Sequence, residues 1–312
     1  MRHMKMGLWP VLLGLLTACI EPMTSPMQPM ATAVVSTATP TVTPSPTPEP
    51  QAALVNGQPI LLADYEREVA FYAASMAMAG QDAATVEGQE ALAQGRELVL
   101  EMLINQLLIE QAAHAAGVTV SDEELDATIA SLRAETGEDA FQQWLVDQGM
   151  SLEDFRRRLR SDTIATQMAN RAVESVPTRA EHIHARHILV NTAEEARQIL
   201  SQLQAGGDFA SLARTYSQDV STRDAGGDLG FFPQGILTAP EVEAAAFALQ
   251  PGQISDVIPS SMGYHIVQVI ERVPDMEIAP ENLRLLREKA SRTWLEGLRA
   301  AADIQRFVST TP

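Results

Sequence analysis

The chain has 312 residues, which by length alone is enough for about two domains of ordinary size. Its 40 Asp and Glu against 22 Lys and Arg give a formal net charge of −18. This charge disfavours nucleic acid as a partner, because binding to it rests on neutralising phosphates. With one cysteine, Cys19, the chain cannot form an internal disulfide.

The first residues have the pattern of a secretory leader. Arg2 and Lys5 precede the apolar run GLWPVLLGLL, whose length is typical of a signal peptide and short for a membrane span. The run continues into LTAC, which resembles a bacterial lipobox, where the cysteine is lipidated and becomes the new N-terminus. We therefore expect residues 1–19 to be a lipoprotein signal peptide with lipid on Cys19. An ordinary signal peptide with an incidental cysteine is the alternative.

Residues 20–50 are rich in Pro, Thr, Ser, Met and Ala, and close with TPTVTPSPTPEP. Such a stretch cannot bury enough apolar surface to fold, and its prolines favour an extended chain. We predict a disordered linker that spaces the folded part from a membrane, to which the acyl chains on Cys19 anchor the protein.

Residues 51–178 have mostly helical periodicity. A short extended piece, LVNGQPI, turns at Asn56-Gly57 and precedes a helix for which Asp64 is the expected N-cap. The segment ELVLEMLINQLLIEQAAHAAG repeats apolar residues at spacings of three and four and stops at Gly117.

Two further helices begin at capping-box signals. Ser121 stands three residues before Glu124, and Ser151 stands three residues before Asp154. Together the patterns predict a five-helix, all-α module.

The pattern changes in residues 179–275 to strand, helices, loop, helix and strands. The segment HIHARHILV alternates and then becomes apolar, as a central strand does, and ISDVIPSSMGYHIVQVIERV reads as two strands joined by a turn. Residues 276–312 return to an amphipathic helix, and its apolar face needs a partner, for which the upstream helices are the obvious choice. The expected fold class is α+β, with the mixed domain inserted into a helical module.

Five motifs then carry a family resemblance: ARHILV, GGDFASLARTYSQD, GGDLGFF, AAFALQPGQIS and GYHIVQV. Their order and spacing over residues 183–273 resemble the parvulin family of peptidyl-prolyl cis/trans isomerases. The sequence of anchor, helices, parvulin domain and closing helix resembles the extracytoplasmic foldases of the PrsA/SurA kind. The resemblance implies a parvulin-like (FKBP-like) antiparallel-sheet domain that isomerises X–Pro bonds in unfolded or partly folded exported polypeptides. We expect no cofactor, and a homodimer formed through the helical half is left open.

The resemblance also assigns residues to the site. His187 and His265 fall at the two facing histidines of the family, and Asp219 falls where members carry Cys or Asp. In the family fold these three meet at the floor of the substrate groove. Ser260 lies near a position whose hydroxyl joins their hydrogen-bond network.

The same alignment places Leu229, Phe232 and Leu237 in the pocket for the substrate proline ring. The family usually has a Phe where this chain has Val242, and the loop before Phe247 is one residue longer than usual. Because valine covers less of a proline ring than phenylalanine, two functions stay open: a membrane-anchored isomerase, or a holdase chaperone with a non-catalytic parvulin domain.

The same residues do not support a metal site, a hydrolase or a phosphate-binding loop. His182 and His184 share one strand face, as metal ligands do, but the sequence shows no Cys or carboxylate set to complete a site. A hydrolase triad of Ser260 or Ser261 with His265 and Asp219 lacks a nucleophile-elbow motif. GGDLG has no P-loop lysine and therefore predicts a turn.

Overall fold

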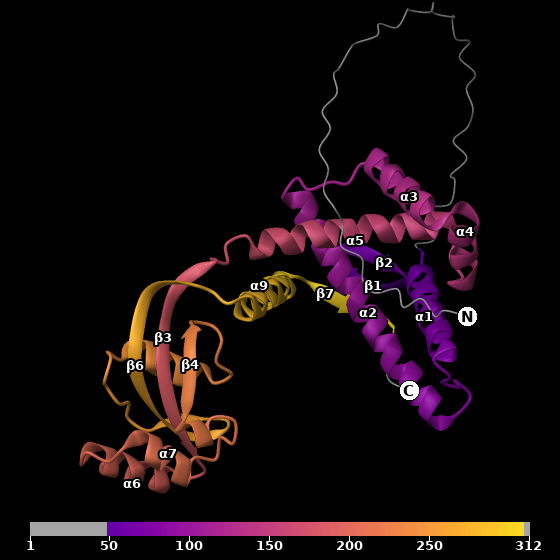
Figure 1. The fold of residues 1–312 in the computed structure, drawn as a ribbon. Coiled ribbons are helices and arrows are strands. Elements are labelled where there is room, and N and C mark those ends of the chain that lie inside the picture. The colour runs from indigo at the N-terminus through magenta and orange to yellow at the C-terminus, as the bar shows by residue number, and fades with distance from the viewer. Residues whose placement is uncertain (1–48, 309–312) are drawn as a thin grey trace, which may run out of the picture. The chain divides into compact units, whose positions relative to one another are not determined.

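The computed structural model describes residues 49–308, so the predicted leader, Cys19 and nearly all of the predicted linker lie outside it. The first part of the described chain is mostly helical, and a long helix lies near its C-terminal end. The middle of the chain forms a sheet with helices on its faces (Figure 1). Within residues 49–308, no helix combines the length and the hydropathy needed to cross a bilayer.

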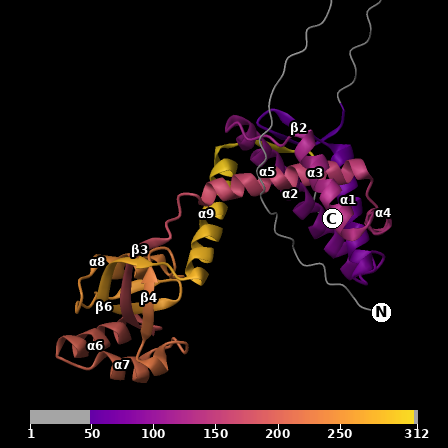
Figure 2. The same ribbon diagram turned by 45° about the horizontal axis from the view of Figure 1, so that its top comes forward.

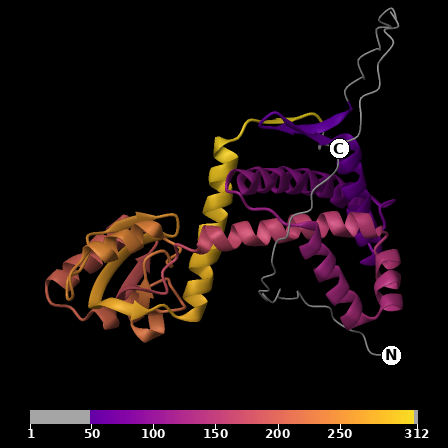
Figure 3. The same cartoon turned by 90° about the horizontal axis from the view of Figure 1, so that it is seen from above.

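The helical region is built from α1 to α5 and α9. Their bounds are α1 Leu62–Met78, α2 Val86–Ala115, α3 Asp122–Thr136, α4 Glu138–Asp147, α5 Leu152–Val173 and α9 Pro280–Ala301. Leu100 and Ile104 of α2 are fully buried in the main core, and Leu298 of α9 packs against it. Arg299 of α9 binds Glu101 on α2. Helix α9 also packs on α5, and Figure 3 shows the two crossing.

The helix starts follow local chemistry. Both predicted capping boxes are confirmed: Ser121 with Glu124 opens α3, and Ser151 with Asp154 opens α5. The expectation that Asp64 caps the first helix was wrong. Helix α1 begins at Leu62, directly after a strand, and Asp64 lies in its first turn, where a carboxylate still interacts favourably with the free backbone N–H groups.

A small sheet, which the sequence did not predict, completes the helical region. Strands β1 (Gln51–Val55) and β2 (Gln58–Leu61) form a hairpin, and β7 (Ile304–Arg306) pairs with β1 from the other end of the chain. The predicted turn is present, with positive φ at both Asn56 and Gly57. Its hairpin therefore gains a third strand from a segment some 250 residues away.

The mixed region is a four-stranded antiparallel sheet in the order β4-β3-β6-β5. Its elements are β3 Arg179–Val190, α6 Ala193–Gln204, α7 Phe209–Tyr216, a 3-10 turn at Arg223–Ala225, β4 Asp228–Pro233, α8 Pro240–Ala248, β5 Ile258–Ser260 and β6 Gly263–Glu277. The long strands β3 and β6 are neighbours in the middle, with Leu189 opposite His265.

Both faces of this sheet are covered. Ile188 and Val190 pack with α6 and α7 on one side, while Ile183 and Ala185 pack with α8 on the other. Figure 2 shows α8 and the pair α6 and α7 on opposite sides of the strands. A central strand covered on both faces reads as a nearly continuous apolar run, as HILV does.

Candidate active site

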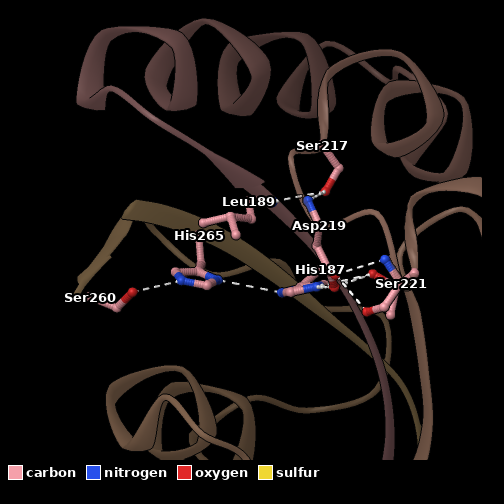
Figure 4. A network of polar contacts seen from close by, with 8 residues as sticks. His187, Leu189, Ser217, Asp219, Ser221, Ser260 and His265 are labelled. Carbon is pink, nitrogen blue, oxygen red and sulfur yellow. Dashed lines mark hydrogen bonds and ion pairs between the residues drawn. The ribbon is translucent and has the colours of Figure 1, made fainter. Parts of the chain in front are cut away.

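A chain of polar contacts crosses the middle of this sheet (Figure 4). His187 Nε2 lies 2.7 Å from Asp219 Oδ2, and His187 Nδ1 lies 3.4 Å from His265 Nδ1. His265 Nε2 lies 2.8 Å from Ser260 Oγ. The structure thus brings together the three residues predicted for the groove floor and the predicted hydroxyl beside them.

Asp219 is held by more donors than the sequence indicated. Its Oδ1 accepts hydrogen bonds from the backbone N–H and the hydroxyl of Ser221 at 3.0 and 2.6 Å, and its Oδ2 accepts one from the Thr222 hydroxyl at 2.6 Å. Burial by itself raises the pKa of Asp219, but the hydrogen bonds from Ser221, Thr222 and His187 outweigh it and hold the pKa well below its ordinary value. The carboxylate is therefore ionised, and its lone pairs are occupied.

His265 is almost completely buried, with 1% of its surface exposed. Burial, followed by repulsion from His187, lowers the pKa of His265 to about 4. The ring is therefore neutral at pH 7. Its plane lies 25° from that of His187, with 5.6 Å between the ring centres.

The hydrogen bonds assign the protons of this chain. An ionised Asp219 can only accept, so Nε2 of His187 carries a proton. In the tautomer that carries the His187 proton on Nε2 alone, His265 Nδ1 donates to His187 Nδ1, and Ser260 donates to His265 Nε2. Each link has one proton, and all of them point towards Asp219.

Two loops tie these side chains to the sheet. Ser217 Oγ accepts from the backbone N–H groups of Leu189 and Asp219, which attaches the Asp219 loop to β3. The backbone N–H of His187 donates to the carbonyl oxygen of Gly227 at 2.8 Å, and Gly227 has φ +82°. A Cβ on Gly227 would lie 2.1 Å from the His187 carbonyl oxygen, so the GGD motif can bring its backbone this close to β3 only with glycine.

The predicted pocket residues form one apolar cluster with α8, but they differ in exposure. Leu229 and Leu237 are half-buried, whereas Phe232 and Val242 are 3% and 2% exposed. Phe232 meets Phe247 edge-to-face at 6.2 Å. Side chains this buried offer a ligand almost no surface. Phe232 and Val242 are therefore packed inside this cluster, whereas we expected both to contact the proline ring of a substrate.

A carboxylate that sequence reasoning missed lies beside this cluster. Glu243 on α8 is buried and accepts hydrogen bonds from three successive backbone N–H groups, those of Gly235, Ile236 and Leu237. The available signal was its place in PEVEAAAFAL, an acidic residue between apolar ones on a helix that must pack on the sheet. Ser221 and Thr222 were also missed, although their two- and three-residue spacing from Asp219 is typical of Asx and related turns.

The other histidines of the strand have local partners. His182 is buried with Nδ1 3.0 Å from the Ala180 carbonyl oxygen, and His184 Nε2 lies 2.7 Å from Asp228 Oδ1. In the part of the chain that the structure describes, no group of three or more His, Cys, Asp or Glu side chains is arranged to hold a metal. Ser261, the residue after Ser260, is exposed.

Two family models match the chain. The PPIC-type PPIase domain model matches residues 184–271, which contain the network from Asp219 to Ser260 and all of the predicted pocket residues. The SurA-like N-terminal domain model matches residues 31–169.

Curated relatives match across both regions. The foldase protein PrsA of Halalkalibacterium halodurans is 34% identical over 232 residues, covering 67% of this chain and 68% of that protein. Foldase protein PrsA 2 of Bacillus cereus is 32% identical over 182 residues, covering 57% of this chain and 61% of that protein. The crystal structure of the peptidylprolyl isomerase PrsA from Bacillus anthracis is 29% identical, with a TM-score of 0.45, covering 64% of this chain and 94% of that one.

Proposed function

Since the chain belongs to the PrsA family of foldases and contains a PPIC-type PPIase domain, we propose that it isomerises X–Pro bonds in unfolded exported polypeptides. The observation that carries the proposal is the continuous network from Asp219 through His187 and His265 to Ser260, on the same sheet as the apolar cluster that includes the half-buried Leu229 and Leu237. A proline ring and the carbonyl before it need these two surfaces side by side.

The reaction requires no bond to the enzyme. Rotation about an X–Pro bond has a barrier of roughly 18–20 kcal/mol and takes tens to hundreds of seconds unaided. In the twisted transition state the amide loses resonance, so its carbonyl is less dipolar and its nitrogen more pyramidal. An apolar pocket that holds the ring and desolvates the carbonyl favours this state over the planar one.

The polar network supplies a fixed field beside the rotating carbonyl. Asp219 carries a permanent negative charge, and His265 stays neutral because its pKa is about 4. The hydrogen bonds keep both rings in one tautomer, so their dipoles need not reorganise during the rotation. With four hydrogen bonds to its oxygens, Asp219 acts as the anchor of the network, and we assign it no nucleophilic step.

The test is cis-to-trans isomerisation of proline tetrapeptides with varied residues before Pro. We expect acceleration by the purified protein and its loss in the double variant Asp219→Ala, His265→Ala. A matched control removes an exposed Asp and an exposed His of the helical region, Asp139→Ala with His114→Ala, and should keep the activity. Circular dichroism checks the folding of both variants.

A second role is favoured by a cavity of about 680 Å³ in the helical region. Among its lining residues, Leu98 and Met102 of α2 leave 62% and 42% of their surface exposed, so the cavity presents apolar side chains to solvent. We propose that this cavity binds apolar segments of unfolded polypeptides. If no peptide is isomerised while the protein still suppresses aggregation of an unfolded protein, the chain is a holdase on a parvulin scaffold.

We further propose that the protein acts outside the cytoplasm, anchored to a membrane by lipid on Cys19. The support is the sequence pattern LTAC after an apolar leader. Cys19→Ser should abolish incorporation of labelled fatty acid and release the protein from the membrane fraction. Unchanged labelling in that variant would contradict the anchor.

A further inference from the structure

The loop between β4 and α8 is attached to a buried carboxylate. Glu243 is 7% exposed, and its Oε1 accepts from Gly235 N at 2.8 Å. Its Oε2 accepts from Ile236 N at 2.8 Å and from Leu237 N at 2.9 Å. Three consecutive amides of one loop thus converge on one side chain.

Burying the carboxylate of Glu243 destabilises the fold unless its oxygens are hydrogen-bonded. A buried carboxylate is destabilising without partners, and within residues 49–308 the salt bridges include none to Glu243, so backbone donors alone compensate its charge. The three amides belong to neither the strand nor the helix and would otherwise lack a protein partner. Gly235, at φ +101°, allows the backbone to turn so that the amides converge.

The loop held in this way carries a pocket residue. Leu237 packs in the same apolar cluster as Val242, the residue directly before Glu243. Helix α8 therefore fixes the loop twice, by the apolar contact of Val242 and by the carboxylate of Glu243. Val242 and Ala246 already attach α8 to the sheet, so the carboxylate is not needed to dock the helix and acts on the loop.

We propose that Glu243 is a positioning residue of the isomerase, which holds Leu237 at the edge of the proline pocket before substrate binds. The inference rests on the proposed function. A loop with a free conformation would have to be ordered by each substrate, and that ordering lowers affinity. Removing the clamp therefore raises KM for proline peptides and leaves kcat nearly unchanged, because the network of His187 and His265 is not altered.

The experiment compares the purified full-length protein with Glu243→Gln. The glutamine keeps the size of the side chain but loses the charge and one acceptor. We expect KM to rise by about tenfold, the order that loss of one or two charge-assisted hydrogen bonds produces, with kcat within about twofold. Amide exchange of peptides covering 234–239 should speed up by a similar factor. Glu194→Gln, an exposed carboxylate in the first turn of α6, is the matched control.

A double-mutant cycle separates positioning from general stability. Leu237→Ala should raise KM by itself, and Glu243→Gln should add almost nothing to it, because Glu243 acts through Leu237. Glu243→Asp, which keeps the charge on a shorter side chain, should give an intermediate KM and serves as the test if the glutamine variant fails to fold.

The outcomes are distinguishable. Wild-type protein that accelerates no peptide contradicts the proposed function and the inference with it. Active wild-type protein with an unchanged KM in both Glu243 variants overturns the inference alone. So does a KM increase that is fully additive with Leu237→Ala, or fast amide exchange of 235–237 in the wild-type protein.

Discussion

The two regions of the described chain bury different kinds of side chain. Between residues 49 and 308, the buried polar residues all lie in the mixed region: His182, His187, Ser217, Glu243, Ser255 and His265. The buried residues of the helical region are apolar or glycine, and its charged groups lie around an open cavity. The mixed region thus buries some of its polar side chains, whereas the charged side chains of the helical region are all at least partly exposed.

The difference matches two kinds of task. Buried polar groups must be satisfied by partners, and a satisfied network holds a single geometry, which suits the field needed beside a rotating amide. Ion pairs near the helical cavity, such as Arg158 with Glu68, are partly exposed and contribute little to stability. They can separate at small cost, which suits a surface that accepts many unfolded chains.

The largest expected effect tests whether the two regions are energetically separate. Ile104→Ala removes a fully buried side chain from the helical core and should lower the free energy of unfolding of that region by about 2–5 kcal/mol. Isomerisation of tetrapeptides, measured below the unfolding temperature, should be unchanged. Thermal unfolding followed by circular dichroism measures the first effect, and a parallel loss of tetrapeptide activity would contradict the separation.

The second effect is a pH dependence of the stability of the mixed region. Below about pH 6.5 an unfolded chain protonates His265, whereas the folded protein does so only near pH 4, so the unfolded state binds more protons and stability falls as the pH falls. A shift of this size contributes up to about 3 kcal/mol between pH 6.5 and 4. The lowered pKa of Asp219 causes a further loss of stability below about pH 3.8, because there the unfolded chain protonates this carboxylate while the folded protein still keeps it ionised.

Hydrogen exchange of the strands β3 and β6 between pH 7 and 4, corrected for intrinsic rates, measures this effect. The variant His265→Gln removes the titrating group and should flatten the profile between pH 6.5 and 4. The apolar core of the helical region around Leu100 provides the internal control and should change less. A profile for β3 and β6 that matches the helical core would contradict the assigned role of His265.

The comparison also explains what the sequence could predict. Local signals were reliable in the helical region, where Ser121 and Ser151 cap helices through residues only three positions away. The pairing of β7 with β1 was not predicted. Ile304–Arg306 is a strand of only three residues, and it forms because β1, which is far away in the sequence, offers it a free edge. Asp64 was misassigned because a helix that follows a strand directly needs no polar cap at that position.

In the mixed region the family motifs indicated His187, Asp219 and His265 because the glycines and strand residues around them fix the same backbone. They did not indicate Glu243 or Thr222. Glu243 acts on loop amides such as that of Leu237, and Thr222 donates to Asp219 Oδ2, and both contacts depend on the three-dimensional positions of these groups. They also could not separate Val242, which is buried, from Leu237, which is half-exposed, since both follow the same apolar pattern.

A smaller effect is expected at the outer end of the polar network. Ser260→Ala removes the hydroxyl bonded to His265 Nε2 and should lower kcat by about fivefold, the equivalent of one ordinary hydrogen bond of about 1 kcal/mol. Ser261→Ala, the exposed neighbour in the same turn, is the control and should be silent. Equal effects of the two variants would mean that the turn, and not the hydroxyl, matters.

The smallest effect concerns the helical cavity. Leu98→Ser with Met102→Ser makes two exposed cavity residues polar, and should weaken suppression of aggregation of denatured lysozyme by about twofold to threefold, because neighbouring apolar contacts share the binding. Val146→Ser, a 71% exposed residue of α4 away from the cavity lining, is the matched control. Stability should change by less than about 0.5 kcal/mol in either variant, since neither is in a core. If tetrapeptide isomerisation falls together with aggregation suppression, the two tasks are not divided between the two regions. If only the suppression of aggregation falls, the exposed apolar residues of the helical region bind unfolded chains, and the buried polar residues of the mixed region determine the rate of isomerisation.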